Sequence, residues 1–445
     1  MTGGETIAAL ATPPGEGALA VIRISGVTAF AVADQIFRGT KPSSQLEERR
    51  VVFGRIVSPE GEVIDEVLLT LFRNPRSYTG EDLVEISGHG GSLVASRVLA
   101  SALAAGARMA RPGEFTERAF LNGKLDLTQA EAVMDLISAN TPRAAKAAAG
   151  QLEGRLGEEI NALRAEILDA VAHLEAFIDF PEEGIDPDSG ALLRARMGKI
   201  AGHLEQLLAT ANEGRLLREG ISLALCGAPN AGKSSLLNCL LGTERAIVSA
   251  TPGTTRDTIE EMVNLGGYPF RVIDTAGLCE TADAVEREGV TRARHAAEQA
   301  DLRLHLVDAS ALQDGITPLF EDELLVFNKV DLVSDRPSLP AGQLISCRSG
   351  EGLEALVSAI LSKVTGRSDG EPAPDGAAIN ARHQECLQRA ASALATTIAM
   401  LDAGESPELI AVELRASLSA VGEVVGEAGT EEILGKIFSS FCIGK

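Results

Sequence analysis

The 445-residue chain lacks tryptophan, has only two tyrosines, and carries 63 acidic residues against 40 basic ones. Its net charge of −23 argues against a general nucleic-acid coat or a binder of anionic membranes, although a local basic patch stays compatible with it. No apolar run is long enough to span a membrane, and no basic-then-apolar signal opens the chain. We therefore expect no membrane partner.

The cysteines are few and scattered, and none forms a C-x-x-C pair. They are Cys226, Cys239, Cys279, Cys347, Cys386 and Cys442. This spacing suggests neither a zinc site nor a disulfide framework, and it is typical of a reducing cytoplasm. The chain is too long for a single hydrophobic core, so several domains are expected.

A glycine-rich turn between an apolar strand and a helix is the clearest motif. The apolar run 221–226 leads into GAPNAGKS (227–234), which precedes the helical sequence SLLNCLLG. Backbone N–H groups of such a loop and the N-terminus of the next helix bind phosphate. Lys233 is predicted to neutralise the β- and γ-phosphates, and the Ser234 hydroxyl to bind Mg²⁺. The alternative, a helix start with incidental glycines, is disfavoured by the strand–loop–helix context.

Two further motifs suit the γ-phosphate and its metal ion. In the polar loop TPGTTRD (251–257), a threonine hydroxyl can complete the Mg²⁺ shell. In DTAG (274–277), Asp274 would reach Mg²⁺ through water. The Gly277 N–H would meet the γ-phosphate, where a residue with a side chain could not approach as closely.

Two more motifs indicate guanine as the base. In NKVD (328–331), Asp331 can accept hydrogen bonds from guanine N1–H and the 2-amino group, both absent from adenine. The backbone of SCR (346–348) can contact guanine O6. A nucleotide fold that has lost binding is disfavoured because every phosphate and base residue is present. The predicted GTP-binding residues are Gly227, Asn230, Ala231, Gly232, Lys233, Ser234, Ser235, Ser249, Ala250, Thr251, Pro252, Gly253, Thr254, Thr255, Asp274, Thr275, Ala276, Gly277, Asn328, Lys329, Asp331, Ser346, Cys347 and Arg348.

The residue that drives hydrolysis is less evident. Leu278 follows Gly277, where many small GTPases carry a glutamine that orients water. Glu286 is a candidate substitute, but from the residues alone a glutamate on a surface helix is the favoured interpretation.

The rest of the chain predicts mixed α/β structure followed by helices. Residues 1–120 alternate strands and helices, and SGHGG (87–91) is favoured as a strand–helix connection over an anion-binding turn. Helical patterns at 121–217 and 366–445 flank the α/β segment 218–365, which indicates a GTPase domain inserted into a helical domain. The fold class is therefore multidomain, α/β plus all-α.

Local signals set the expected helix boundaries. A capping box of Thr128 and Glu131 should open one helix, and Thr141 with Pro142 should open a long amphipathic helix that continues to about residue 180. Another helix is expected from about 191 to 217.

The motifs together resemble the tRNA-modification GTPases of the MnmE (TrmE) family. The resemblance is carried by GAPNAGKSS, GTTRD and DTAGL, and outside the GTPase domain by GEFTERAFLNGKLDLTQAEA (113–132) and FSSFCIGK (438–445). The opening TPPGEGALAVIRISG and the segment TGEDLVEISGHGG also match, so the likeness spans the chain. It implies an N-terminal folate-binding-like dimerisation domain, a discontinuous helical domain and an inserted Ras-like domain.

The resemblance also implies the activity. Family members form homodimers and work with an FAD-containing partner, MnmG (GidA), as a heterotetramer. They add an aminomethyl or carboxymethylaminomethyl group to C5 of the wobble uridine of certain tRNAs. The carbon comes from 5-formyl- or 5,10-methylene-tetrahydrofolate. K⁺ stimulates their GTP hydrolysis, and they act in the cytoplasm.

Site roles carry over by position. K⁺, which replaces the charge of an arginine finger, is assigned to Asn230, Ser249, Thr251 and Thr254. Mg²⁺ is assigned to Ser234, Thr255 and, through water, Asp274, and Glu286 matches the catalytic glutamate, which reverses the interpretation above. Arg23, Glu85, Lys124 and Lys445 match the folate positions, and Cys442 matches the cysteine of the terminal signature.

Some features depart from the family or leave another function open. Ala250 and Pro252 are local variants in the K⁺ loop, and the segment between Asp308 and Asn328 is short for the family. A ribosome-assembly or translation-type GTPase would share the five motifs. It would, however, carry a basic RNA-binding module with aromatic side chains, and the flanking domains here are acidic. A stand-alone folate enzyme is the third possibility, and it would turn over without GTP.

Overall fold

The computed structural model describes residues 4–180, 190–243, 260–274, 299–311, 323–333, 341–366, 379–427 and 431–445. Two compact units divide the chain. The first comprises residues 1–134, 156–165 and 418–445, and the second comprises 135–155 and 166–417. The GTPase segment thus shares its unit with helical residues on both of its sides.

The first unit is built on a seven-stranded sheet in the order β3-β4-β5-β6-β2-β1-β7, in which only the β1–β7 pair is parallel. Its strands are β1 (Ile7–Leu10), β2 (Leu19–Ser25), β3 (Phe37–Arg38), β4 (Val52–Val57), β5 (Val63–Phe72), β6 (Leu83–His89) and β7 (Arg108–Met109). The expected alternation of strands and helices in residues 1–120 is confirmed, but the short strands β3 and β7 were not predicted because two residues show no alternation.

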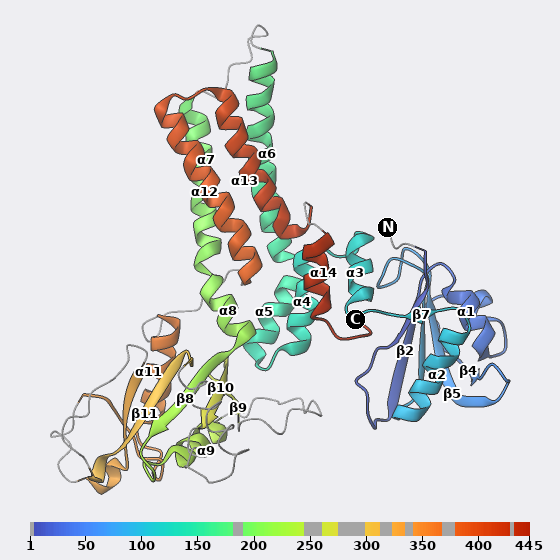
Figure 1. The fold of residues 1–445 in the computed structure, drawn as a ribbon, viewed down its shortest axis with the longest axis horizontal. Coiled ribbons are helices and arrows are strands. Elements are labelled where there is room, and N and C mark those ends of the chain that lie inside the picture. The colour runs from blue at the N-terminus through green and yellow to red at the C-terminus, as the bar shows by residue number, and fades with distance from the viewer. Residues whose placement is uncertain are drawn as a thin grey trace, which may run out of the picture. The chain divides into compact units, whose positions relative to one another are not determined.

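Two helices, α1 (Ala29–Ile36) and α2 (Ser92–Ala104), cover one face of this sheet (Figure 1). Alternate residues of the central strands, among them Ile22 and Ile86, point to that face and are buried. The SGHGG segment forms the end of β6 and the turn into α2, so its interpretation as a strand–helix connection is confirmed.

A buried charge network fixes α3 (Glu114–Leu121), a helix that the sequence analysis did not predict. Glu114 accepts hydrogen bonds from Arg108 (2.6 Å), Arg118 (3.0 Å) and the Arg111 backbone N–H (2.9 Å). Burial opposes the charge, but these bonds prevail and lower the pKa of Glu114 to about 2.

The start of α4 (Leu127–Ser138) differs from the prediction. Asp126 takes the capping position: its Oδ1 accepts from the Gln129 N–H at 2.9 Å, and Gln129 Oε1 accepts from the Asp126 N–H at 3.0 Å. The predicted capping box of Thr128 and Glu131 is therefore wrong by two residues, because the carboxylate of Asp126 meets the first-turn N–H groups before the threonine.

The predicted long helix is two helices. Thr141 caps α5 (Pro142–Leu152) as predicted, by accepting from the Ala144 N–H. A turn at Gly154, with a left-handed φ of 92°, separates α5 from α6 (Arg155–Asp179). The next predicted helix is likewise divided at Thr210 into α7 (Gly190–Ala209) and α8 (Ala211–Glu219).

The second unit contains a six-stranded sheet in the order β13-β12-β11-β8-β10-β9, parallel except for the β9–β10 hairpin. The strands are β8 (Ile221–Gly227), β9 (Glu260–Leu265), β10 (Tyr268–Asp274), β11 (Leu302–Asp308), β12 (Glu323–Asn328) and β13 (Gln343–Leu344). Strand β9 was not predicted. Because β8, β11 and β12 are parallel neighbours, the loops that follow them lie at one edge of the sheet.

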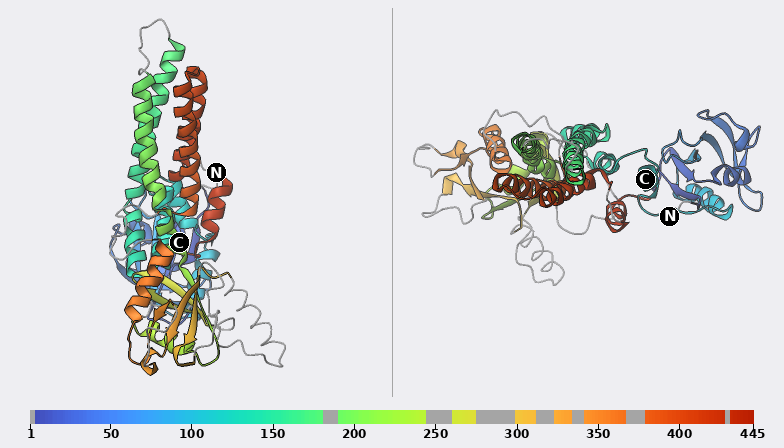
Figure 2. Two further views of the ribbon diagram at one scale, coloured as in Figure 1. Left: turned by 90° about the vertical axis from the view of Figure 1, so that its left-hand side faces the viewer. Right: turned by 90° about the horizontal axis from the view of Figure 1, so that it is seen from above.

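The chain after residue 220 also forms helices among its described residues. These are α9 (Lys233–Thr243), directly after the phosphate loop, α11 (Leu353–Thr365), α12 (Ala381–Ala403), α13 (Pro407–Val425) and α14 (Glu431–Ser439). Helix α12 packs along α7, from the other side of the GTPase segment, and both views of Figure 2 show the two helices together. None of the helices in the described ranges is long and apolar enough to cross a bilayer.

Candidate functional site

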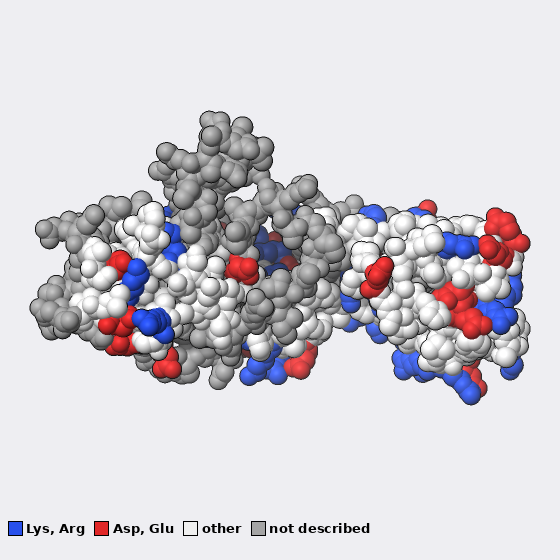
Figure 3. Space-filling model, turned by 90° about the horizontal axis from the view of Figure 1, so that it is seen from below, with Lys and Arg blue, Asp and Glu red and all other residues white. Residues whose placement is uncertain are grey.

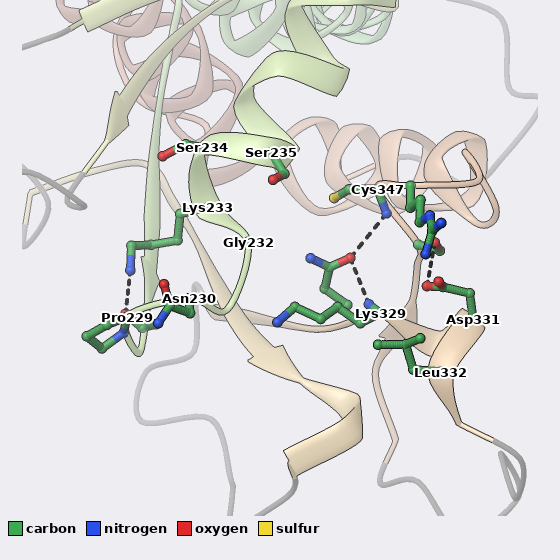
Figure 4. Close-up of a pocket in the computed structure, with 14 residues that line it drawn as sticks. Pro229, Asn230, Gly232, Lys233, Ser234, Ser235, Lys329, Asp331, Leu332 and Cys347 are labelled. Atoms are coloured by element: carbon green, nitrogen blue, oxygen red, sulfur yellow. Dashed lines mark hydrogen bonds between the residues drawn. The ribbon is translucent and has the colours of Figure 1, made fainter.

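The phosphate loop and both guanine motifs line one cavity of about 820 Å³ (Figure 4). Its lining residues are Gly227, Pro229, Asn230, Gly232, Lys233, Ser234, Ser235, Asn328, Lys329, Asp331, Leu332, Ser346, Cys347 and Arg348. All of these except Pro229 and Leu332 were predicted from the sequence motifs. Pro229 is one of the unspecified residues between Gly227 and Gly232 of the loop, and Leu332 directly follows NKVD, so neither residue type carried a signal of its own.

The backbone of the phosphate loop has a conformation that only certain residues adopt. Gly227 and Gly232 have φ values of 135° and 102°, and Asn230 has a φ of 64°, which asparagine tolerates better than most residues. A Cβ on Gly227 would lie 2.2 Å from the Leu306 carbonyl oxygen, and one on Gly232 would lie 2.2 Å from Asn328 Nδ2. The two glycines therefore permit both the turn and its close packing.

Lys233 and Ser234 stand at the start of α9 and line the cavity, and a helix N-terminus favours an anion. The Lys233 ammonium donates to the carbonyl oxygens of Gly227 (2.8 Å) and Ala228 (3.1 Å), so it lies along its own loop. An ammonium has three donors, and these two bonds leave one for an anion. The Ser234 side chain is exposed to the cavity.

Asn328 ties three parts of the cavity together. Its Nδ2 donates to the Ala231 carbonyl at 3.0 Å, while its Oδ1 accepts from the backbone N–H groups of Lys329 (2.8 Å) and Cys347 (3.2 Å). Asn328 is almost fully buried. Ala231, one of the predicted GTP-binding residues, is also buried and meets Asn328 rather than lining the cavity.

The side chains at the base-binding end are held by their neighbours. Asp331 Oδ1 accepts from the Ser346 hydroxyl at 2.7 Å. Lys329, with a left-handed φ of 64°, donates to Asp308 Oδ2 at 2.6 Å. Burial alone would raise the pKa of Asp308, but hydrogen bonds from Lys329 and Ser310 hold it below its ordinary value.

Several predicted residues lie outside the described ranges. They are Ser249, Ala250, Thr251, Pro252, Gly253, Thr254, Thr255, Thr275, Ala276, Gly277 and Glu286. Asp274 is the last residue of β10, and its paired position on β8 is Leu225, two residues before Gly227. The backbone of Asp274 thus ends at the same edge of the sheet as the phosphate loop.

The first unit brings Arg23 and Glu85 together. They are paired across β2 and β6, and Glu85 Oε1 accepts from Arg23 Nε (3.0 Å) and Nη2 (2.7 Å). The guanidinium also lies over the rings of Tyr78 (5.2 Å) and Phe115 (5.7 Å). Neither aromatic residue was predicted at this site.

The chain's last residues pack against α3. The backbone N–H groups of Gly113 and Phe115 donate to the carbonyl oxygens of Cys442 (3.4 Å) and Lys445 (3.3 Å). The tail is held by Phe438 and Phe441, which are buried in one cluster with Leu127. The Cys442 side chain is exposed.

Lys124 reaches the loop that carries Tyr78. Its ammonium donates to the Pro75 carbonyl at 3.2 Å. Phe115 lies under the Arg23 guanidinium and donates its backbone N–H to the Lys445 carbonyl, whereas Lys124 bonds to the loop at Pro75.

A parallel sheet that gathers a phosphate loop, NKVD and SCR around one cavity defines a P-loop GTPase domain. The sequence matches the "MnmE helical domain" family over residues 127–442 and the "GTP-binding protein TrmE N-terminus" family over residues 6–124. The chain belongs to the MnmE (TrmE) family.

Full-length relatives agree with this assignment. The chain is 48% identical over 445 residues to the "tRNA modification GTPase MnmE" of Akkermansia muciniphila, covering 99% of each chain. It is 46% identical over 466 residues to the protein of the same name from Symbiobacterium thermophilum, covering 100% of each. The Chloroflexus aurantiacus protein of that name is 46% identical over 459 residues, covering 99% of this chain and 100% of its own.

Proposed function

We propose that this protein hydrolyses GTP as part of an enzyme that modifies the wobble uridine of tRNA. The observation that carries the proposal is the single cavity of about 820 Å³ shared by the phosphate loop and both guanine motifs, in a chain that matches MnmE relatives from end to end. The site is proposed to act in the cytoplasm.

Different residues of the cavity are proposed to bind the phosphates and the guanine base. The N–H groups of the 227–234 loop and the third Lys233 donor bind the β- and γ-phosphates. Asp331, oriented by Ser346, accepts the guanine N1–H and 2-amino hydrogens. Asn328 holds the phosphate loop and the Cys347 backbone at a fixed separation, so nucleotide and protein need little rearrangement.

The residues present suit the two cations. The Ser234 hydroxyl, exposed in the first turn of α9, is an oxygen ligand of the kind Mg²⁺ takes, and Thr255 and Asp274 complete its proposed set. Asn230 lines the same cavity and is the proposed K⁺ ligand, with Ser249, Thr251 and Thr254. When bound, both ions supply positive charge to the phosphates, and Glu286 is proposed to orient water.

The N-terminal unit is proposed to bind a tetrahydrofolate. Both Arg23 bonds go to Glu85 Oε1, which leaves Oε2 for a pterin donor, and the guanidinium keeps its remaining Nη1 for a carboxylate. Lys124, Lys445 and exposed Cys442 are the other proposed residues.

An exposed apolar face supports a homodimer through the N-terminal sheet. Phe53 and Leu68 are paired across β4 and β5 and are 59% and 46% exposed, and Leu19 on β2 is 66% exposed. Cross-strand partners share a face, and the pairings Leu68–Ser87 and Ser87–Val21 place these residues on the face of Arg23. Large apolar side chains grouped in this way mark an interaction surface.

The tRNA is proposed to be bound jointly with an FAD-containing partner of the MnmG type, in a heterotetramer. On the face in Figure 3, Lys and Arg side chains lie next to Asp and Glu among the described residues, without a broad basic area. With a net charge of −23, this chain offers little for a polyanion, so the partner supplies most of the tRNA contact. The GTPase segment is proposed as an insertion between α8 and α12.

Two measurements test the proposal. The purified protein should release phosphate from GTP faster in KCl than in NaCl, and a strain without the gene should lack the modified wobble uridine in a tRNA nucleoside profile. Equal rates in both salts together with a normal profile would refute it.

Asp331→Asn tests the guanine contact. The amide replaces one acceptor with a donor, so GTP affinity should fall about a hundredfold while affinity for xanthosine triphosphate, which has a carbonyl in place of the 2-amino group, rises. Titration of both nucleotides gives the answer. The matched control is Asp402→Asn, on α12 and exposed, and unchanged base preference in Asp331→Asn would exclude Asp331 from the base site.

A further inference from the structure

The β9–β10 hairpin connects two γ-phosphate motifs to the opposite end of the GTPase sheet. Strand β9 begins three residues after the TPGTTRD loop, and β10 ends at Asp274 of DTAG. The hairpin turn is Gly266–Gly267, with left-handed φ values of 58° and 89°. Because Asp274 pairs with Leu225 near the phosphate loop while Phe270 pairs with Ile221, the turn lies at the end away from the nucleotide.

Three side chains from three elements meet at this turn. Arg143 of α5 lies over the Tyr268 ring at 4.4 Å and forms an ion pair with Glu213 of α8. Glu213 Oε2 also accepts from the Tyr268 hydroxyl at 2.7 Å. Tyr268, at the start of β10, is 3% exposed, so its ring and hydroxyl are shielded from water.

Backbone contacts at the turn reinforce the triad. The Thr141 hydroxyl donates to the Gly267 carbonyl at 2.8 Å and accepts from the Ala144 N–H as the cap of α5. A Cβ on Gly267 would lie 3.1 Å from Arg143 Cδ, so the turn and the arginine stem fit closely. Thr141 thus links the N-terminus of α5 to the hairpin turn.

Helix α8 holds two strands that carry nucleotide loops. It holds β8 by chain continuity, since only Gly220 separates Glu219 from Ile221, and it holds β10 through the bond between Glu213 and Tyr268. The helical residues Leu216 and Leu217 share one buried cluster with Phe270. A shift of β10 against β8 therefore changes the geometry at Glu213 directly.

We propose that Arg143, Glu213 and Tyr268 form a coupling joint, which transmits the nucleotide state from the β9–β10 hairpin to α5 and α8. These are positioning residues, since they act through the hairpin and do not touch nucleotide. The inference rests on the proposed function, because it requires that the cavity binds guanine nucleotides in two states.

The test is hydrogen–deuterium exchange on the full chain with GDP and with a non-hydrolysable GTP analogue. In the wild type, the exchange rates of α5 and α8 should differ between the two nucleotides. Tyr268→Phe removes only the hydroxyl that reaches Glu213, and Glu213→Gln removes the charge opposite Arg143. Each should reduce that difference about fivefold, with nucleotide affinity within about twofold of wild type.

The matched control is Asp402→Asn, which breaks an exposed ion pair with Arg194 between α12 and α7 and should leave the difference unchanged. Thermal unfolding verifies that each variant is folded. Identical exchange with both nucleotides in the wild type, or a wild-type difference in both joint variants, would overturn the proposal. Phosphate release is measured on the same samples, and its absence would refute the GTPase assignment alone, since the exchange comparison requires only binding.

Discussion

The nucleotide cavity and the Arg23–Glu85 pair handle charge in opposite ways. The phosphate end of the cavity offers backbone N–H groups, a helix N-terminus and Lys233, and the acidic residue lining the described part, Asp331, belongs to the guanine motif. In the N-terminal unit the cation and the anion neutralise each other at 2.7 Å. The phosphate end therefore presents positive groups among its described residues, whereas Arg23 and Glu85 pair with each other.

The difference predicts which substitutions matter at each site. The phosphate end of the cavity binds through backbone N–H groups of one loop. A substitution that disturbs this loop therefore displaces several N–H groups at once and should strongly weaken binding. Arg23 and Glu85 already bond to each other, so ligand binding there exchanges one set of hydrogen bonds for another. The binding free energy gained is only the difference between the two sets. Single changes there should have modest effects on affinity.

Gly232→Ala should have the largest effect of the changes that probe this comparison. The added Cβ would meet Asn328 Nδ2 in a backbone conformation with a φ of 102°, so both the loop and its tie to the guanine motif are lost. GTP affinity should fall about a hundredfold, as strain of about 3 kcal/mol implies. Titration with a fluorescent GTP derivative measures this.

Gly242→Ala on α9 is the matched control, since a Cβ there meets nothing within 4 Å. It should bind as the wild type does. Equal affinity in the two variants would mean that the cavity is not held by its backbone.

Glu114→Gln removes a charge of the N-terminal unit that stabilises the fold and lies outside the Arg23–Glu85 pair. Loss of the carboxylate leaves Arg108 and Arg118 without their shared partner, so the free energy of unfolding should fall by about 2 kcal/mol at neutral pH. Because the pKa of Glu114 is lowered to about 2, its contribution is complete above its ordinary pKa of 4.5 and is lost as the pH falls toward 2.

Urea unfolding of the N-terminal unit between pH 5 and about pH 2.5 measures that dependence. The wild type should lose stability through this range, and the variant should lose less. Parallel curves for the two proteins would show that Glu114 is not the group responsible.

The phosphate-loop turn could be predicted from sequence because its geometry is local: glycines at fixed spacing between a strand and a helix determine the turn. The Asn328 tie was not predictable, since it joins residues 97 apart in sequence and depends on which strands are neighbours. The break at Gly154 was missed because the apolar spacing Leu152, Leu156, Ile160 continues across it. Arg23 and Glu85 were identified by resemblance, but their pairing requires the β2–β6 register.

Glu85→Gln, at the Arg23–Glu85 pair, should have the smallest effect of the three substitutions. One amide oxygen can still accept from Arg23, but the second position becomes a donor, which opposes the pterin N–H groups proposed to bind there. Affinity for 5-formyltetrahydrofolate, measured by calorimetry, should fall about tenfold while GTP turnover is unchanged. Glu66→Gln is the matched control, because Glu66 is exposed on the neighbouring strand and is paired with Arg55 in the same way. Equal folate binding by both variants would place the ligand elsewhere and leave Arg23–Glu85 as a structural pair.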